Sequence, residues 1–155
     1  LQGYSNKGHD GFLGNSVLGE WCNLGADTNT SNLKNNYSSV RVRSIAARQD
    51  VDTGLTFCGL IMGSHAKAGI NTMFNTGTVV GPAANVFGGG FPPKYIPAFA
   101  WGGAAGFETF ALDKALEVAT RVMARRSRAL TPGEAALLTA CFHDTAPERY
   151  WEEPA

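Results

Sequence analysis

Apolar and small residues recur every six positions in two stretches of the chain. The first reads FLGNSV, LGEWCN and LGADTN from Phe12, and the second reads MGSHAK, AGINTM, FNTGTV and VGPAAN from Met62. The first position of each hexad is apolar: Phe12, Leu18, Leu24, Met62, Ala68, Phe74 and Val80. The fifth is small: Ser16, Cys22, Thr28, Ala66, Thr72, Thr78 and Ala84. This pattern is neither strand alternation nor a helical stripe.

A six-residue period predicts a short strand followed by a tight corner, so that three hexads close one triangular turn of a coil. Hexapeptide repeats of this kind are the sequence signature of a parallel β-helix. We expect the left-handed form that this template usually takes, despite the right-handed preference of ordinary crossovers. First-position side chains should fill the interior, and glycine in the second position suits a corner where a Cβ would be awkward.

Three segments depart from the period. Residues 33–59 predict a protruding loop with some strand, because residues 40–43 alternate in polarity. Residues 1–11 also fail, since Asn6 stands where an apolar residue is expected. The Gly/Pro-rich residues 92–107 predict a connector that continues neither period. The predicted organisation is a β-helix domain over residues 1–91, this connector over 92–107, and a helical segment over 108–155.

The C-terminal third predicts two helices. Between about residues 108 and 126, apolar residues fall on one face at spacings of three and four: Leu112, Leu116, Ala119 and Met123. A second helix to about Asp144 should begin at Thr131, followed by a first-turn proline and the capping-box residue Glu134. The fold class is therefore all-β with a C-terminal helical appendage. Because three-sided prisms pack against their own copies, we expect a homotrimer.

Composition narrows the function. Lys plus Arg and Asp plus Glu both number 13 in 155 residues, which argues against a nucleic-acid binder. Three cysteines without a CxxC pair predict reduced thiols, and no apolar span of about 18 residues exists, so we expect a soluble cytoplasmic protein. The chain opens at Leu1, and we expect it to be part of a longer protein.

The segment HDGFLGNSVLGEWCNLGADTNTSN, residues 9–32, resembles a motif of left-handed β-helix acyltransferases. In that motif a histidine precedes a YLG…IGxxxNIGAGTxxxN pattern. The likeness covers roughly residues 8–126 and points to the acetyltransferase half of bifunctional sugar-1-phosphate nucleotidyltransferase/acetyltransferases. It implies transfer of an acetyl group from acetyl-CoA to the amine of an amino-sugar 1-phosphate, with no metal, and a nucleotidyltransferase domain that precedes this segment.

The resemblance also implies roles for six residues. His9 matches the catalytic base; Asn23, Asn32 and Phe12 match substrate-binding positions; Ala26 and Ser64 match acetyl-CoA-binding positions. Imidazole suits this role because it titrates near neutral pH. Three residues depart from the family pattern: Phe12 and Leu33 replace tyrosines, and Asp27 replaces a glycine.

Other interpretations stay open. His9 could be an ordinary loop histidine, and the asparagines could simply bond corner backbone. The chain could be a non-catalytic trimerising module of a sugar nucleotidyltransferase. The γ-type carbonic anhydrases share the coil, but His9, His65 and His143 lack their closely spaced zinc-binding pair. The arginines between residues 121 and 128 are either a solvated helix end or a clamp for the phosphates of CoA.

Overall fold

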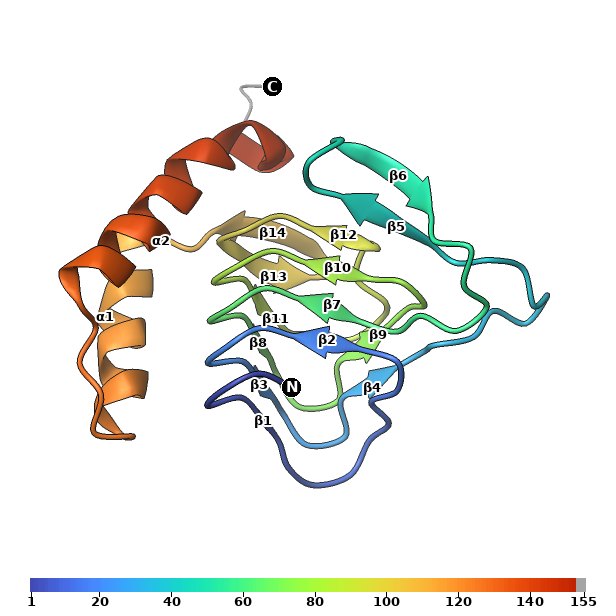
Figure 1. Ribbon diagram of the computed structural model, residues 1–155, viewed down its shortest axis with the longest axis horizontal. Helices are drawn as coiled ribbons and strands as arrows, with labels where there is room; N and C mark the ends of the chain where they lie inside the picture. The colour runs from blue at the N-terminus through green and yellow to red at the C-terminus, as the bar shows by residue number, and fades with distance from the viewer. Residues whose placement is uncertain (153–155) are drawn as a thin grey trace.

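A computed structural model describes residues 1–152 and shows a stack of parallel strand pairs beside two helices (Figure 1). The last three residues of the predicted helical segment, 153–155, lie outside the described residues. The strands of the stack are two residues long: β1 (Asn6–Lys7), β2 (Val17–Leu18), β3 (Asn23–Leu24), β4 (Asn29–Thr30), β7 (Ile61–Met62), β8 (Lys67–Ala68), β9 (Met73–Phe74), β10 (Val79–Val80), β11 (Asn85–Val86) and β12 (Tyr95–Ile96).

These strands form parallel sheets whose neighbours lie far apart in the chain. One sheet runs β1-β3-β8-β11-β13, a second runs β2-β7-β10-β12, and β4 pairs with β9. Strands β13 (Ala100–Gly103) and β14 (Gly106–Thr109) close the first sheet as an antiparallel pair. Parallel sheets with C-terminal helices confirm the coarse prediction of a β-helix-like architecture. The hand of the coil and the hexapeptide template stay predictions.

The interior of the stack is apolar. Six first-position side chains are buried, each at most 4% exposed: Leu18, Leu24, Met62, Ala68, Phe74 and Val80. Phe12 was expected beside them, but it is 54% exposed. The physical reason is that no strand forms at this position, and Leu13 packs against the core in its place.

The corners of the coil account for the glycines in the second position of the hexads and for the small polar residues in the fifth. Fourth-position residues take a left-handed backbone, as at Trp21 (φ 61°) and His65 (φ 63°). The second-position glycines are needed because neighbouring coils nearly touch there, and a Cβ on Gly81 would lie 2.3 Å from the backbone nitrogen of Ala98. A threonine in the fifth position is small, and its buried hydroxyl finds a backbone acceptor: Thr28 Oγ1 donates to the carbonyl of Gly69 at 3.1 Å.

The predicted loop over residues 33–59 protrudes on the right of Figure 1 and carries the hairpin of β5 (Arg41–Ser44) and β6 (Gln49–Asp52). The coil resumes after this loop, as the parallel pairing of β2 with β7 across the insertion shows. Val40, at the base of the hairpin, is fully buried.

Two expectations about the ends of the coil were wrong. Residues 92–107 are no connector, because β12 pairs with β10 and β13 with β11. Pro97 is tolerated because β12 is an edge strand, and no further strand of that sheet needs the missing N–H. At the other end, β1 pairs with β3 one residue later than expected, with Lys7 opposite Leu24. The Lys7 ammonium donates to the carbonyls of Gly8, His9 and Asp10, so a cation is tolerated there.

The two predicted helices are present as α1 (Leu112–Ala124) and α2 (Pro132–Asp144). The capping box of Thr131 and Glu134 is confirmed, whereas α1 begins later than expected because Gly106–Thr109 forms β14. Both helices pack beside the stack rather than over its end, on a cluster that includes three buried corner residues: Ala83, Ala98 and Phe99.

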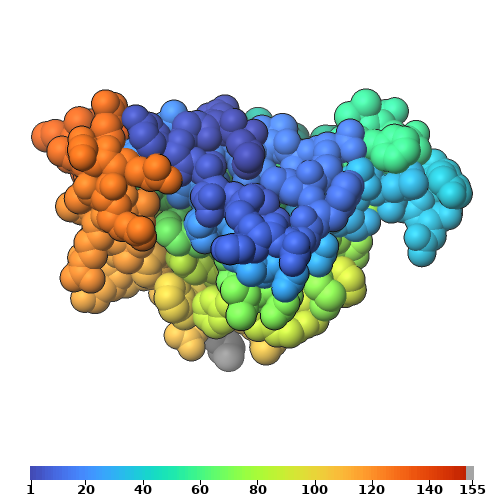
Figure 2. Space-filling view, turned by 90° about the horizontal axis from the view of Figure 1, so that it is seen from below, coloured from blue at the N-terminus to red at the C-terminus, as the bar shows by residue number. Residues whose placement is uncertain are grey.

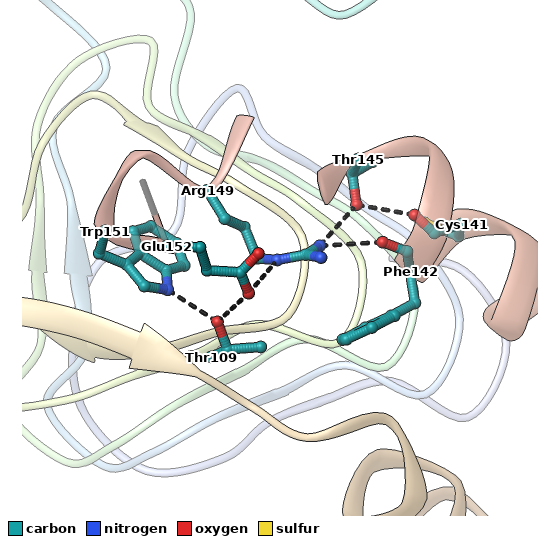
Figure 3. A network of polar contacts seen from close by, with 7 residues as sticks. All are labelled: Thr109, Cys141, Phe142, Thr145, Arg149, Trp151 and Glu152. Atoms are coloured by element: carbon teal, nitrogen blue, oxygen red, sulfur yellow. Dashed lines mark hydrogen bonds and ion pairs between the residues drawn. The ribbon is translucent and has the colours of Figure 1, made fainter. Parts of the chain in front are cut away.

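A buried arginine ties the end of the described chain to the helices (Figure 3). Arg149 is 2% exposed and follows the short helix η1 (Ala146–Glu148). Its guanidinium donates to the carbonyl of Phe142 at 3.0 Å and to Glu152 at 2.8 Å. Trp151, in the short helix η2 (Tyr150–Glu152), packs against the core of the stack.

Candidate functional site

His9 lies at an exposed corner between β1 and Phe12. Its backbone is left-handed (φ 62°), and its carbonyl accepts a hydrogen bond from Lys7 Nζ at 3.3 Å. The next residue, Asp10, accepts the backbone N–H of Asp27 at 2.9 Å. Consequently the His9 corner lies against the Ala26–Asp27 corner of the following coil, which brings the proposed base next to one proposed acetyl-CoA position.

Phe12 and Asn32 also come together, around Gly14. A Cβ on Gly14 would lie 2.4 Å from Phe12 Cζ and 2.9 Å from Asn32 Nδ2. The Asn32 amide donates to Asn15 Oδ1 at 2.7 Å, and Asn29 Oδ1 accepts the backbone N–H of Phe12 at 2.8 Å. These asparagines therefore brace the corners, whatever else they contact.

Asn23 and Ser64 lie elsewhere in the same chain. Asn23 points outward from the β1-β3-β8 sheet and accepts a hydrogen bond from Asn6 Nδ2 at 3.2 Å. Ser64 lies at the corner between β7 and β8, where its Oγ accepts the backbone N–H of Glu20 at 3.1 Å. The six residues thus form separate groups on different corners and faces of one chain.

A cavity of about 560 Å³ lies between the outer side of this sheet and the end of α1. Its lining residues are Tyr4, Asn6, Trp21, Cys22, Asn23, Lys67, Val122, Arg125 and Arg126. Of these, sequence reasoning had marked Asn23 and the arginines but missed Lys67. The available signal was its place in the sixth position of a hexad, which directs the side chain outward like that of Asn23.

Aromatic stacking forms one wall of this cavity. The Tyr4 and Trp21 rings are 4.0 Å apart and nearly parallel, and His65 follows on the next coil. Burial, with the nearby Lys67 charge, lowers the pKa of His65 to about 4, and Glu134 acts in the opposite direction. Burial also lowers the pKa of Lys67, whose ammonium donates to the carbonyl of His65 at 2.8 Å.

Two further findings concern the described part of the chain. Within residues 1–152, no group of three or more His, Cys, Asp or Glu side chains could hold a metal ion. None of the helices in this part is both long and apolar enough to cross a membrane.

Comparison with known proteins confirms the resemblance seen in the sequence. The chain is 37% identical over 73 residues to the bifunctional protein GlmU of Methanocaldococcus jannaschii, a match that covers 47% of this chain and 17% of that protein. It is 31% identical over 81 residues to a bifunctional sugar-1-phosphate nucleotidylyltransferase/acetyltransferase of Sulfurisphaera tokodaii, covering 52% and 20%. A GlmU of Methanococcus aeolicus is 32% identical over 73 residues, covering 47% and 17%.

These matches define a class, the sugar nucleotidyltransferase/acetyltransferases, to which about half of this chain is similar. The aligned segment takes up no more than a fifth of the length of each of these relatives. No family model matches the chain.

Proposed function

We propose that this chain transfers an acetyl group from acetyl-CoA to the amine of an amino-sugar 1-phosphate, as part of a sugar nucleotidyltransferase/acetyltransferase. The proposal includes a left-handed hexapeptide coil, a homotrimer, a cytoplasmic setting and a preceding nucleotidyltransferase domain. The observation that carries it is the exposed residue His9 on a corner adjacent to Ala26, in a chain similar to a bifunctional sugar-1-phosphate nucleotidylyltransferase/acetyltransferase.

In the proposed reaction the sugar amine attacks the thioester carbonyl while His9 accepts the proton that the nitrogen loses. The C–S bond then breaks, the amide forms, and the departing thiolate takes the proton to leave as CoA thiol. A backbone N–H at Ala26 or Ser64 would stabilise the developing oxyanion. Because the six candidate residues form separate groups in one chain, complete sites would form where neighbouring subunits meet.

The test follows the loss of thioester absorbance when the chain is mixed with acetyl-CoA and glucosamine 1-phosphate. This readout avoids thiol reagents, which would also report the half-buried thiol of Cys141. His9→Ala should lower the rate about 10²- to 10⁴-fold, the usual contribution of a general base. His143→Ala, at the exposed end of α2, is the matched control. Wild-type turnover in His9→Ala would contradict the assignment.

The second candidate is a trimerising module without chemistry, and the departures from the family pattern at Phe12, Asp27 and Leu33 favour it. Either candidate needs a trimer surface, and on the β2-β7-β10 sheet Val17 is 59% exposed beside the partly buried Ile61, whereas Val79 in the same row is only 5% exposed. Val17→Asp should dissociate a trimer in sedimentation measurements, with Ser38→Asp in the exposed loop as the control. A stable trimer that never consumes acetyl-CoA would favour this candidate over the enzyme.

A further inference from the structure

We propose that the cavity between α1 and the β1-β3-β8 sheet binds the phosphate group of a phosphorylated metabolite, through Lys67, Arg125 and Arg126. The cavity is built within one chain, and two of these cations directly follow α1, outside the hexad pattern. The cavity includes Asn23, one of the proposed substrate-binding residues, but not His9.

The two walls of the cavity present donors toward one space. On the sheet, Asn6, Asn23 and Lys67 occupy one row, because β1 pairs Asn6 with Asn23 and β8 pairs Lys67 with Asn23. Residues in register on parallel strands point to the same face. Opposite them, Arg125 is the C-cap of α1 and Arg126 follows it. Seen from the β1 end in Figure 2, the orange end of α1 borders the dark blue N-terminal residues.

The charges in this space are all of one sign. Three of the lining residues are cationic, and among the residues of the described chain that line the cavity none is an aspartate or glutamate. Arg125 and Arg126 are exposed and Lys67 is partly buried, so an anion between the two walls would be attracted by cations on both sides. A phosphate dianion is the matching ligand, because Arg binds it through paired N–H donors and Lys as a point charge.

Hydrogen-bond donors of Lys67 and Asn23 that remain available in the cavity also favour an anionic ligand. An ammonium group has three donors, and Lys67 Nζ spends one on the carbonyl of His65 at 2.8 Å. Asn23 uses its side-chain oxygen to accept from Asn6, which leaves the NH₂ of Asn23 as the donor available to a ligand. Burial lowers the pKa of Lys67 because it disfavours the charged ammonium, and a bound anion would offset that cost.

The space exceeds what an inorganic ion needs. A volume of about 560 Å³ falls within the range of roughly 300–1,000 Å³ typical of small-molecule sites. Tyr4 and Trp21 supply an aromatic surface at one side, suited to a sugar ring or a base. The ligand class is therefore an organic phosphate. Naming the sugar 1-phosphate or the nucleotide end of CoA as its source rests on the proposed function, whereas the binding itself does not.

Calorimetric titration of the full chain tests the proposal. The probes are glucosamine 1-phosphate, adenosine 3′,5′-bisphosphate as the nucleotide end of CoA, and inorganic phosphate. One of the organic phosphates should bind more tightly than inorganic phosphate, and affinity should fall with added salt. Lys67→Met and Arg125→Gln should each weaken binding about tenfold, the loss of one charge-assisted contact of about 1.4 kcal/mol.

Arg128→Gln is the matched control, because Arg128 is exposed, lies close in sequence and does not line the cavity. Its affinity should stay within about twofold of the wild type, since only the overall charge changes. If Lys67→Met fails to fold, the exposed pair Arg125→Gln with Arg126→Gln makes the same test. The probe that binds identifies the source of the phosphate.

Two results would overturn the site: no organic phosphate binds, or Arg128→Gln weakens binding as much as Arg125→Gln does. Failure of the proposed function looks different. If the chain binds the probe but consumes no acetyl-CoA, the phosphate site is supported and the acetyltransferase proposal is contradicted. Conversely, if turnover depends on His9 but Lys67→Met leaves binding unaffected, the phosphate site is contradicted and the acetyltransferase proposal is supported.

Discussion

The imidazole of His65 stacks on the indole of Trp21, with ring centroids 6.3 Å apart and planes 17° from parallel. Both residues have a left-handed backbone at the same corner of successive coils, where the N–H of His65 donates to the carbonyl of Glu20 at 2.8 Å. The backbone geometry of the corner therefore aligns these side chains along the stack. Nδ1 of His65 is buried in this stack without a hydrogen-bond partner among the described residues.

The stack should make stability depend on pH. Burial lowers the pKa of folded His65 from 6.5 to about 4, so between these values the unfolded chain binds more protons than the folded chain. The stabilising contribution is therefore complete above pH 6.5 and is lost as pH falls toward 4. His65→Asn keeps a residue that tolerates positive φ and should reduce the fall in melting temperature between pH 7 and pH 5.

The exposed His143 supplies the control for that measurement. His143→Asn removes a solvent-exposed imidazole and gives the reference pH dependence with which His65→Asn is compared. An identical fall with pH in His65→Asn and the wild type would contradict the role of His65.

A methyl group on a corner glycine should be costly where coils nearly touch. Gly81→Ala should lower the unfolding free energy by about 1–3 kcal/mol, because its Cβ would lie 2.3 Å from the backbone nitrogen of Ala98. Gly133→Ala is the matched control in α2, where nothing lies within 4 Å, and helix propensity should stabilise it by up to about 1 kcal/mol. Urea unfolding measures both, and equal effects would refute the steric argument.

Arg149 should contribute more to stability than its ion-pair partner Glu152. Arg149→Met leaves the carbonyl of Phe142 and the hydroxyl of Thr145 without this donor and should cost about 2–4 kcal/mol. Glu152→Gln keeps an oxygen that can accept from Arg149 Nε but removes the counter-charge of a guanidinium that is 2% exposed, and should cost about 1–2 kcal/mol. Chemical denaturation of the two variants compares them, and a larger loss in Glu152→Gln would reverse the assignment.

The capping box gives a local prediction. Thr131→Ala removes the hydroxyl that accepts the N–H of Glu134 at 3.2 Å and should lower stability by about 1 kcal/mol. Thr120→Ala, in the exposed part of α1, removes a hydroxyl that bonds only along its own helix and should change stability little. Loss of helical circular dichroism on heating reports both variants. A neutral Thr131→Ala would mean that tertiary packing alone fixes the start of α2.

How far the sequence predicts this molecule depends on how local the cause is. The inner residues from Leu18 to Val80 and the cap at Thr131 follow from spacing and propensity, and the structure bears them out. Phe12 was misplaced because apolar character alone does not reveal that Leu13 turns inward instead. The glycine-rich and proline-rich residues 92–107 were misread because composition hides strands only two residues long.

The candidate site was harder to predict, because it depends on contacts between distant segments. Lys67 and Arg125 share a cavity only because α1 folds back along the sheet, and no local pattern contains that information. The resemblance named His9 and Ala26, and the structure places their corners on adjacent coils. Their roles stay predictions until the rates are measured.

The hairpin insertion shows that the register of the stack does not depend on the length of chain between two paired strands. Val17–Leu18 meets Ile61–Met62 in the same parallel register as the latter meets Val79–Val80, although far more chain separates the first pair. The stack therefore keeps its strand pairing whatever the length of the lateral insertion. A foreign peptide inserted at the turn between β5 and β6 should leave the pairing of the stack unchanged. Such a scaffold offers engineers a handle for display on the flank opposite the helices.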